Sequence, residues 1–280
     1  MRSYRRRKAV RKTLMWAGVV FFVIVSIFPL VEALLSSLKP PSQLFSRSSS
    51  IFLPSSVTLL HYRELLGGTR FLTYYFNTTV VTFFTLALVI PISALAAYSL
   101  TRFEFPGRDL YRRLILFTYM LPPILLFLPL HAVLTRLGLV NSRAGLIFAY
   151  TSFCLPFGMW LLRAFFVGVP VSLEEAAMVD GATRLSAFFR IVLPQVVSGV
   201  VAVSVFVCVV CWNEYLYALV LTSSAEMKTL PVGLATFIRM YTIDWGMVMA
   251  SVVLTSAPLV VLYMFVQRHL LKGFAGAVKG

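Results

Sequence analysis

Long apolar runs separated by short polar segments are the main feature of this chain. Six runs of about 20 or more residues contain few charges: roughly 14–35, 76–100, 114–134, 144–167, 193–221 and 247–267. An α-helix rises about 1.5 Å per residue, so about 20 apolar residues cross the hydrocarbon core of a bilayer. The pattern predicts an all-α polytopic membrane protein with six transmembrane helices. A basic segment over 1–13 precedes a single transmembrane domain over 14–280.

Composition and charge placement support a membrane protein and exclude a nucleic-acid footprint. The chain is 59% hydrophobic and 12% charged, about half the charge of a soluble domain. If the six spans alternate, the side of the amino terminus carries 17 Lys and Arg residues and the other side 8, together the 25 of the chain. This bias predicts that both termini are cytoplasmic. The net charge of +15 is therefore interpreted as a topology signal and a contact for membrane lipid.

Prolines within or at the start of most predicted spans are expected to kink or break these helices, because each proline removes a backbone donor. They are Pro29, Pro91, Pro122, Pro123, Pro129, Pro156, Pro194 and Pro258.

A short acidic segment stands out in the longest inside loop, residues 168–192. The stretch "EEAAMVDGATRLSAFFRIVLP" (174–194) has three acidic residues and no basic one before Gly181. Ser172 and Glu175 have the spacing of a capping box, Gly181 predicts a left-handed helix end, and Thr183 can cap a second helix. Helices that lie on anionic lipid normally present Lys and Arg, so this segment is expected to bind a basic groove of a partner protein. A linker lying on the membrane is the alternative.

The same stretch resembles the EAA loop of ABC-importer permease subunits. The matching residues are Glu174, Glu175, Ala176, Ala177, Met178, Asp180, Gly181, Ile191, Leu193 and Pro194. The segments "ALAAYSLTRFEFPGR", "PFGMWLLRAFF", "WNEYLYAL" and the terminal "GAVKG" extend the resemblance to the MalG-type permeases of sugar importers. It covers residues 70–280 well and the first span only loosely.

The resemblance implies a type I ABC-importer permease in a bacterial or archaeal cytoplasmic (inner) membrane. Its implied partners are a second, related but different permease subunit, two ATP-binding subunits and an extracytoplasmic solute-binding protein. The EAA loop would be the coupling helix that docks on an ATP-binding subunit. The chain would bind no cofactor itself, since ATP and Mg²⁺ would belong to those partners.

Glu214 is the most informative charged residue within a span, because a carboxylate at membrane depth is costly and faces a cavity or partner by default. Asn213 and Glu214 offer hydrogen bonds to a sugar, and Trp212, Tyr215 and Tyr217 offer stacking faces. These five residues are the candidates for the substrate pathway. The alternative is that Glu214 makes a structural bond to a neighbouring helix or subunit.

The sequence shows no catalytic motif. It lacks the G-x-x-x-x-G-K-[ST] phosphate loop, and His61, His131 and His269 are scattered without clustered acids, so neither ATP hydrolysis nor a metal site is expected. Two other functions stay open: an ATP-independent secondary transporter or channel, and an ABC permease for a solute other than a sugar.

Overall fold

The computed structural model describes residues 2–44, 54, 56–239 and 244–277, with side chains described over 11–44, 54, 56–236 and 244–267. The chain divides into two compact units, each considered by itself. The first unit comprises Met1–Thr69 with Phe237–Ala257, and the second comprises Arg70–Thr236 with Pro258–Gly280.

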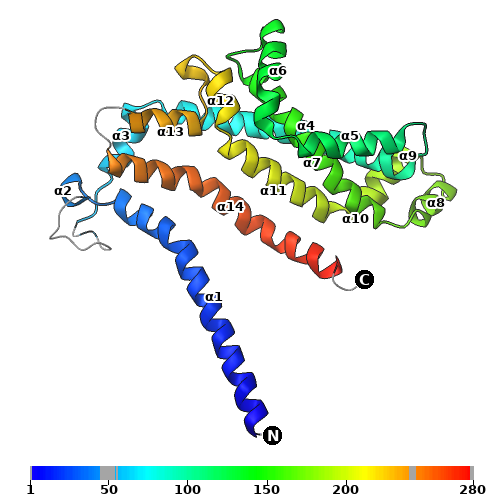
Figure 1. Ribbon diagram of the computed structural model, residues 1–280, viewed down its shortest axis with the longest axis horizontal. Coiled ribbons are helices and arrows are strands. Elements are labelled where there is room, and N and C mark those ends of the chain that lie inside the picture. The colour runs from blue at the N-terminus through cyan, green and yellow to red at the C-terminus, as the bar shows by residue number, and fades with distance from the viewer. Residues whose placement is uncertain (1, 45–53, 55, 240–243, 278–280) are drawn as a thin grey trace. The chain divides into compact units, whose positions relative to one another are not determined.

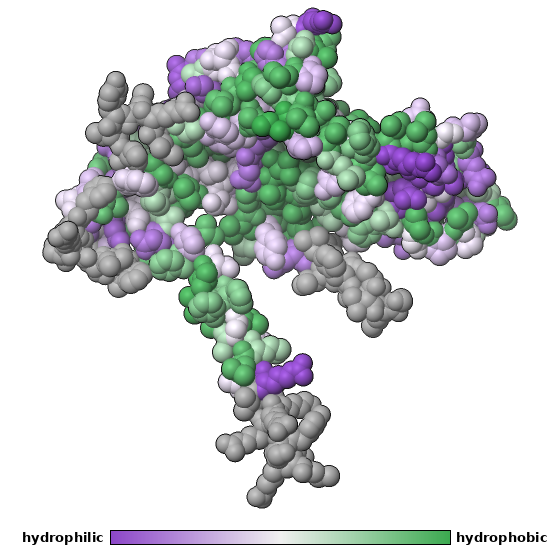
Figure 2. All heavy atoms as spheres, viewed as in Figure 1, coloured by the Kyte–Doolittle hydropathy of each residue, from purple (hydrophilic) through white to green (hydrophobic). Residues whose placement is uncertain are grey.

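The first unit is built from a long apolar helix and short helices that follow it. Its helices are α1 (Arg2–Ser37), α2 (Pro41–Leu44), α3 (Leu60–Gly68) and the beginning of α14 (Trp245–Ala277). Helix α1 is one long helix (Figure 1), and the described part of its visible surface is mostly hydrophobic (Figure 2). Large apolar side chains from Leu14 to Leu34 are exposed, and Phe21, Phe22 and Ile24 are more than half exposed. A helix that is apolar all round suits a lipid environment.

The second unit contains the core. Its elements are α4 (Phe71–Arg102), α5 (Arg108–Met120), α6 (Pro123–Arg136), α7 (Arg143–Val167), α8 (Ser172–Val179), α9 (Arg184–Ala187), the π-helical turn η1 (Phe188–Val192), α10 (Leu193–Gln195), α11 (Val197–Asn213), α12 (Leu216–Leu221), the 3-10 turn η2 (Ala225–Met227) and α13 (Leu230–Arg239). Helices α4, α7 and α11 pack against one another. Their contacts are fully buried apolar residues, including Val89, Ala97, Cys154, Leu162 and Val203.

The third predicted span, 114–134, is not one straight helix. Helices α5 and α6 meet at an angle of 101°. The break falls at Leu121 and Pro122, whose ψ angles are both 128°. Each of these residues precedes a proline, and proline disfavours the helical region for the residue before it. Pro122 and Pro123 also lack the amide hydrogens that would continue the helix. By contrast, α4 continues through Pro91 and α7 continues through Pro156.

The fifth predicted span, 193–221, is also interrupted. The segment Arg184–Gln195 bends by 76° relative to α11. At the other end, Glu214 has an extended backbone (φ −68°, ψ 124°), so α11 ends at Asn213 and α12 begins at Leu216. Among the described residues, four helices are long and apolar enough to cross a membrane, or up to six if each bent pair is one span. The all-α membrane fold is confirmed.

Hydrophilic side chains gather at one end of the second unit, near α8 and α9, whereas hydrophobic side chains cover much of its remaining surface (Figure 2). The acidic segment therefore lies at a polar end of the bundle and not along its apolar sides.

Candidate functional site

The acidic segment forms helix α8, but its beginning differs from the predicted capping box. Val171 is the N-cap residue, and no side chain caps the helix. Ser172 is already helical, and the amide of Glu175 bonds to the carbonyl oxygen of Val171 at 3.1 Å. The Ser172–Glu175 prediction is therefore wrong. The first turn is held by tertiary contacts instead.

Glu174 anchors α8 to the end of α4. Its side chain is buried, with 4% of the residue exposed. Its Oε1 forms an ion pair with Nε of Arg102, and its Oε2 accepts a hydrogen bond from the Tyr98 hydroxyl at 2.8 Å. The side chain of Arg102 is also only 5% exposed. A buried charge pair of this kind holds its geometry because either charge alone would be costly to bury.

The same two residues of α4 extend the anchor further. Arg102 donates a second hydrogen bond to the carbonyl oxygen of Val169, at 2.8 Å, just before α8. The ring of Tyr98 lies 4.7 Å from the ring of Phe188 in η1. Helix α8 and the turn that follows it are thus fixed to one point of α4. A movement of α8 would be transmitted to this helix of the bundle.

The end of α8 agrees with the prediction from the sequence. Gly181 has φ +90°, a conformation that costs other L-residues roughly 1–2 kcal/mol. Its amide bonds to Met178 O at 3.1 Å and the Ala182 amide bonds to Ala177 O at 2.9 Å, which is the Schellman pattern. Thr183 caps α9, because its Oγ1 accepts a hydrogen bond from the Ser186 amide at 3.2 Å.

The exposed face of this loop combines acidic and apolar residues. Glu175, Ala176 and Asp180 are exposed, while Val179 is 88% exposed and Leu185 is 61% exposed. Neither Val179 nor Leu185 was predicted from the sequence to belong to a binding surface, although exposed apolar side chains on a polar loop are a feature of such surfaces.

The remaining residues of the EAA pattern have mixed positions. Ala177, Met178, Ile191 and Leu193 are partly buried, and Pro194 is exposed. Leu193 packs against the core, and its neighbour Val192 is fully buried. The second half of the pattern therefore joins the loop to α11, while the exposed part of the first half is free to meet a partner.

A cavity of about 710 Å³ lies where the two broken spans face each other in the second unit. It is lined by Thr118, Tyr119, Leu121, Pro123, Leu126, Phe153, Phe206, Val210, Asn213, Glu214, Tyr215, Leu216 and Tyr217. The break at Leu121 and the break at Glu214 both contribute to this lining. Non-helical backbone at membrane depth is tolerated where it lines a water-filled cavity or is buried in protein. The position of these two breaks at the cavity explains how they can occur within membrane spans.

Glu214 is positioned by protein donors. Its Oε1 accepts a hydrogen bond from the Tyr217 amide (2.8 Å), and its Oε2 accepts from the Ala218 amide (3.0 Å) and the Tyr150 hydroxyl (2.8 Å). The carboxylate thus satisfies the free amides at the beginning of α12, where a negative charge is favoured. This geometry favours the structural alternative for Glu214, although the residue also lines the cavity.

The other candidates for the substrate pathway divide into two groups. Asn213, Tyr215 and Tyr217 line the cavity, and the Tyr217 hydroxyl donates to Pro123 O at 2.6 Å, which ties α12 to the beginning of α6. Trp212 is outside the set of lining residues. It is 4% exposed and its ring packs edge-on against Tyr75 at 5.6 Å. Its side chain therefore takes part in the packing of α11 against α4.

A network of polar contacts at the other end of the second unit was not predicted from the sequence. Asn77 donates to the carbonyl oxygens of Glu226 (2.7 Å) and Lys228 (2.8 Å), and accepts from Nε of Arg143 (2.8 Å). Arg70 pairs with the Glu226 carboxylate, and this hydrogen bond holds the pKa of Glu226 below its usual value. These bonds fix the loop that follows α12 to the first turns of α4 and α7.

Comparison with known proteins identifies the family of this chain. The model of the family described as "Binding-protein-dependent transport system inner membrane component" matches residues 66–276. The probable ABC transporter permease protein YurM of Bacillus subtilis is 33% identical over 99% of this chain and 91% of its own length. The trehalose/maltose transport system permease protein MalG of Thermococcus litoralis is 32% identical over 98% of this chain and 99% of its own length.

A solved structure agrees with this result. It is a bacterial ABC transporter involved in the import of the acidic polysaccharide alginate, with a TM-score of 0.81 and 23% identity, covering 94% of this chain and 97% of the other. The family model and the two relatives confirm the resemblance carried by the EAA loop and the segments around it. The chain belongs to the family of inner-membrane permease components of binding-protein-dependent ABC transport systems.

Proposed function

We propose that this permease imports a sugar or oligosaccharide across a bacterial or archaeal cytoplasmic membrane, with both of its termini in the cytoplasm. It pairs with a second, related permease subunit. Two ATP-binding subunits hold ATP and Mg²⁺, and an extracytoplasmic solute-binding protein delivers the substrate. The chain itself binds no nucleotide and hydrolyses no ATP.

The aromatic lining of the cavity is the observation that carries the sugar proposal. Tyr119, Phe153 and Tyr215 contribute rings, and Asn213 contributes an amide whose nitrogen also donates to Val209 O at 2.8 Å. The volume of the cavity, about 710 Å³, lies within the range of about 300–1,000 Å³ for small-molecule sites. Relatives named for trehalose/maltose and for arabinooligosaccharides support the same substrate class.

Docking of the ATP-binding subunit is assigned to the exposed face of α8. Because the Glu174 carboxylate is buried and paired with Arg102 within this subunit, the partner contacts Glu175, Asp180 and Val179 instead. The two carboxylates suit a basic groove, and burial of Val179 adds about 1.5–3 kcal/mol if it is complete. Anionic lipid would repel the same carboxylates, which disfavours the alternative of a membrane-lying linker.

The mechanism is alternating access. ATP binding brings the two ATP-binding subunits together and moves the docked α8 segments with them. Through Glu174, Arg102 and Tyr98 this displacement reaches α4, and through η1 it reaches α11, which carries the cavity. ATP and the loaded binding protein both favour the outward-open state, so each strengthens the effect of the other.

Uptake of a panel of labelled sugars and amino acids by vesicles holding the reconstituted complex tests the substrate class. We expect sugar uptake, and a three- to tenfold higher KM for Asn213→Ala, because a lost hydrogen bond is worth about 0.5–1.5 kcal/mol. Phe83→Ala is the control, since Phe83 is 62% exposed on the outside of α4. Uptake of amino acids alone would contradict the sugar proposal and favour another solute.

Recovery of the ATP-binding subunit on the tagged permease tests the docking surface. We expect Val179→Ser and Glu175→Lys to reduce recovery strongly, and Val57→Ser to leave it unchanged. Val57 is 69% exposed in the first loop and is placed outside by the charge bias. Equal recovery with all three variants would mean that this loop is a linker.

A further inference from the structure

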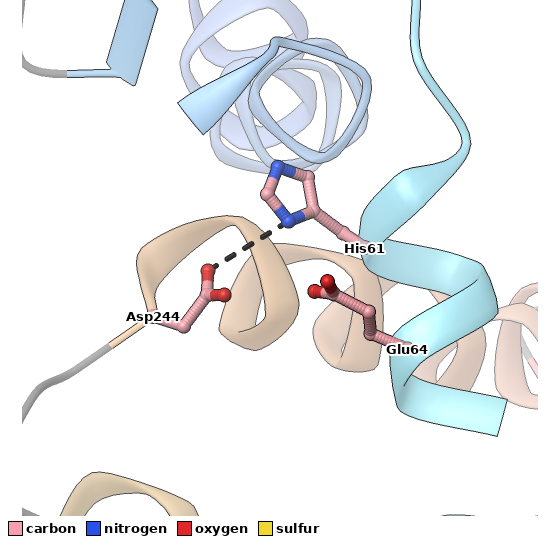
Figure 3. Close-up of side chains that lie close together, drawn as sticks. All are labelled: His61, Glu64 and Asp244. Carbon is pink, nitrogen blue, oxygen red and sulfur yellow. Dashed lines mark ion pairs between the residues drawn. The ribbon is translucent and has the colours of Figure 1, made fainter. Parts of the chain in front are cut away.

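Three side chains outside the coupling loop and the cavity form a cluster in the first unit. His61 and Glu64 lie on α3, and Asp244 lies immediately before α14. One ligand atom from each lies within 4.8 Å of the other two, and the carboxylates point toward the imidazole (Figure 3). This group cannot be recognised from the sequence, because Asp244 is far from the other two residues along the chain.

The imidazole of His61 is held in a fixed orientation. The residue is completely buried. Its Nε2 lies 3.0 Å from the carbonyl oxygen of Lys39, which can only accept, so Nε2 carries a hydrogen and donates. Gly246 lies against the ring so closely that a Cβ there would overlap it. The ring therefore cannot turn away from the cluster.

This orientation leaves Nδ1 aimed at two carboxylates. Nδ1 is buried without a hydrogen-bond partner and lies 3.7 Å from Oδ1 of Asp244. With Nε2 protonated, the neutral ring presents a lone pair from Nδ1 to groups that are themselves acceptors. Two nearby carboxylates also repel each other. A cation among the three atoms resolves both conflicts.

We propose that His61, Glu64 and Asp244 form a three-ligand site for a divalent cation of the zinc class. An imidazole nitrogen with two carboxylate oxygens suits Zn²⁺, whereas Ca²⁺ and Mg²⁺ prefer oxygen ligands alone. The bond from Nε2 to Lys39 is the outer contact that metal-binding histidines typically make. Two carboxylates would balance the charge of the ion. Glu64 and Asp244 are exposed, so the ion has access from solvent and a water can complete its coordination.

The cation would tie two segments that lie far apart along the chain. Helix α3 follows the first span, and Asp244 precedes the last one. A bound ion would fix these two segments of the first unit to each other. The site therefore acts as a clamp, and its loss should lower the thermal stability of the purified transporter.

Zinc binding by the purified, chelator-treated complex tests this proposal. ZnCl₂ is titrated against a competing fluorescent chelator, and the metal content is measured after dialysis. We expect one Zn²⁺ per copy of this chain and a higher melting temperature with Zn²⁺. Asp244→Asn and Glu64→Gln should each weaken binding by at least tenfold, since even changes outside the ligands cost about 10–100-fold. Both residues are exposed, so these variants should fold even if His61→Ala does not.

Glu104→Gln and His131→Ala are the matched controls, because they remove an exposed carboxylate and a second imidazole elsewhere. They should bind Zn²⁺ like the unmodified protein. Absence of stoichiometric Zn²⁺, or equal affinity in Asp244→Asn and Glu64→Gln, would overturn the proposal.

Discussion

Removal of the Arg102 side-chain charge tests whether helix α8 depends on its anchor. Arg102→Met removes the ion pair with Glu174 and the bond to Val169, but keeps most of the aliphatic volume. Glu174 then remains buried with the Tyr98 hydroxyl and no cation. Breaking a buried pair in this way costs about 3–5 kcal/mol.

This free energy sets the size of the measurable effects. It corresponds to a factor of about 100 to 5,000 in an equilibrium constant. Exchange of the amide hydrogens in α8 should accelerate by up to this factor. The apparent affinity for the ATP-binding subunit should fall by no more than the same factor, because it scales with the fraction of loop in the docking conformation.

The assay combines hydrogen exchange of residues 172–181 with subunit recovery and uptake. Arg113→Met is the control, because Arg113 is exposed on α5. The double variant Arg102→Met with Glu174→Gln should recover much of the loss, since an amide can still accept from Tyr98 and no charge is left unpaired. Normal exchange and uptake in Arg102→Met, or a double variant as impaired as the single one, would refute the anchor.

Three further predictions concern other parts of the second unit. Gly181→Val should destabilise the end of α8 by roughly 1–2 kcal/mol, because valine resists a positive φ, and should reduce ATPase recovery, whereas Gly168→Ala (φ −74°) should not. Arg70 lowers the pKa of Glu226, so their pair stabilises the loop fully above the ordinary pKa of a glutamate, and this stabilisation is lost as the pH falls through the lowered pKa. The melting temperature of Arg70→Gln should therefore fall less on acidification than that of the unmodified protein. Glu214→Gln should lower the melting temperature of the complex by weakening the beginning of α12, at about 1–2 kcal/mol, with little change in KM; a large rise in KM would make Glu214 a substrate ligand.

The sequence alone determined the class of the protein and the end of the acidic helix in its longest predicted inside loop. Apolar runs long enough to cross a bilayer can satisfy their backbone groups as helices, so their number and length predicted the all-α membrane fold. Local chemistry was equally informative at Gly181 and Thr183. A left-handed residue and a side-chain cap depend on neighbours within a few positions, and both were predicted correctly.

The tertiary structure decided what distant residues do. The capping box at Ser172 did not form, because the first turn of α8 is held by Tyr98 and Arg102 of another helix. The two consecutive prolines are visible in the sequence. The sequence does not show that the break at Leu121 faces the break at Glu214 across one cavity. Pairings between residues far apart in the chain depend on how helices pack, which no local pattern encodes. His61, Glu64 and Asp244 illustrate the same limit: scattered in sequence, they meet only because the fold brings α3 and the beginning of α14 together.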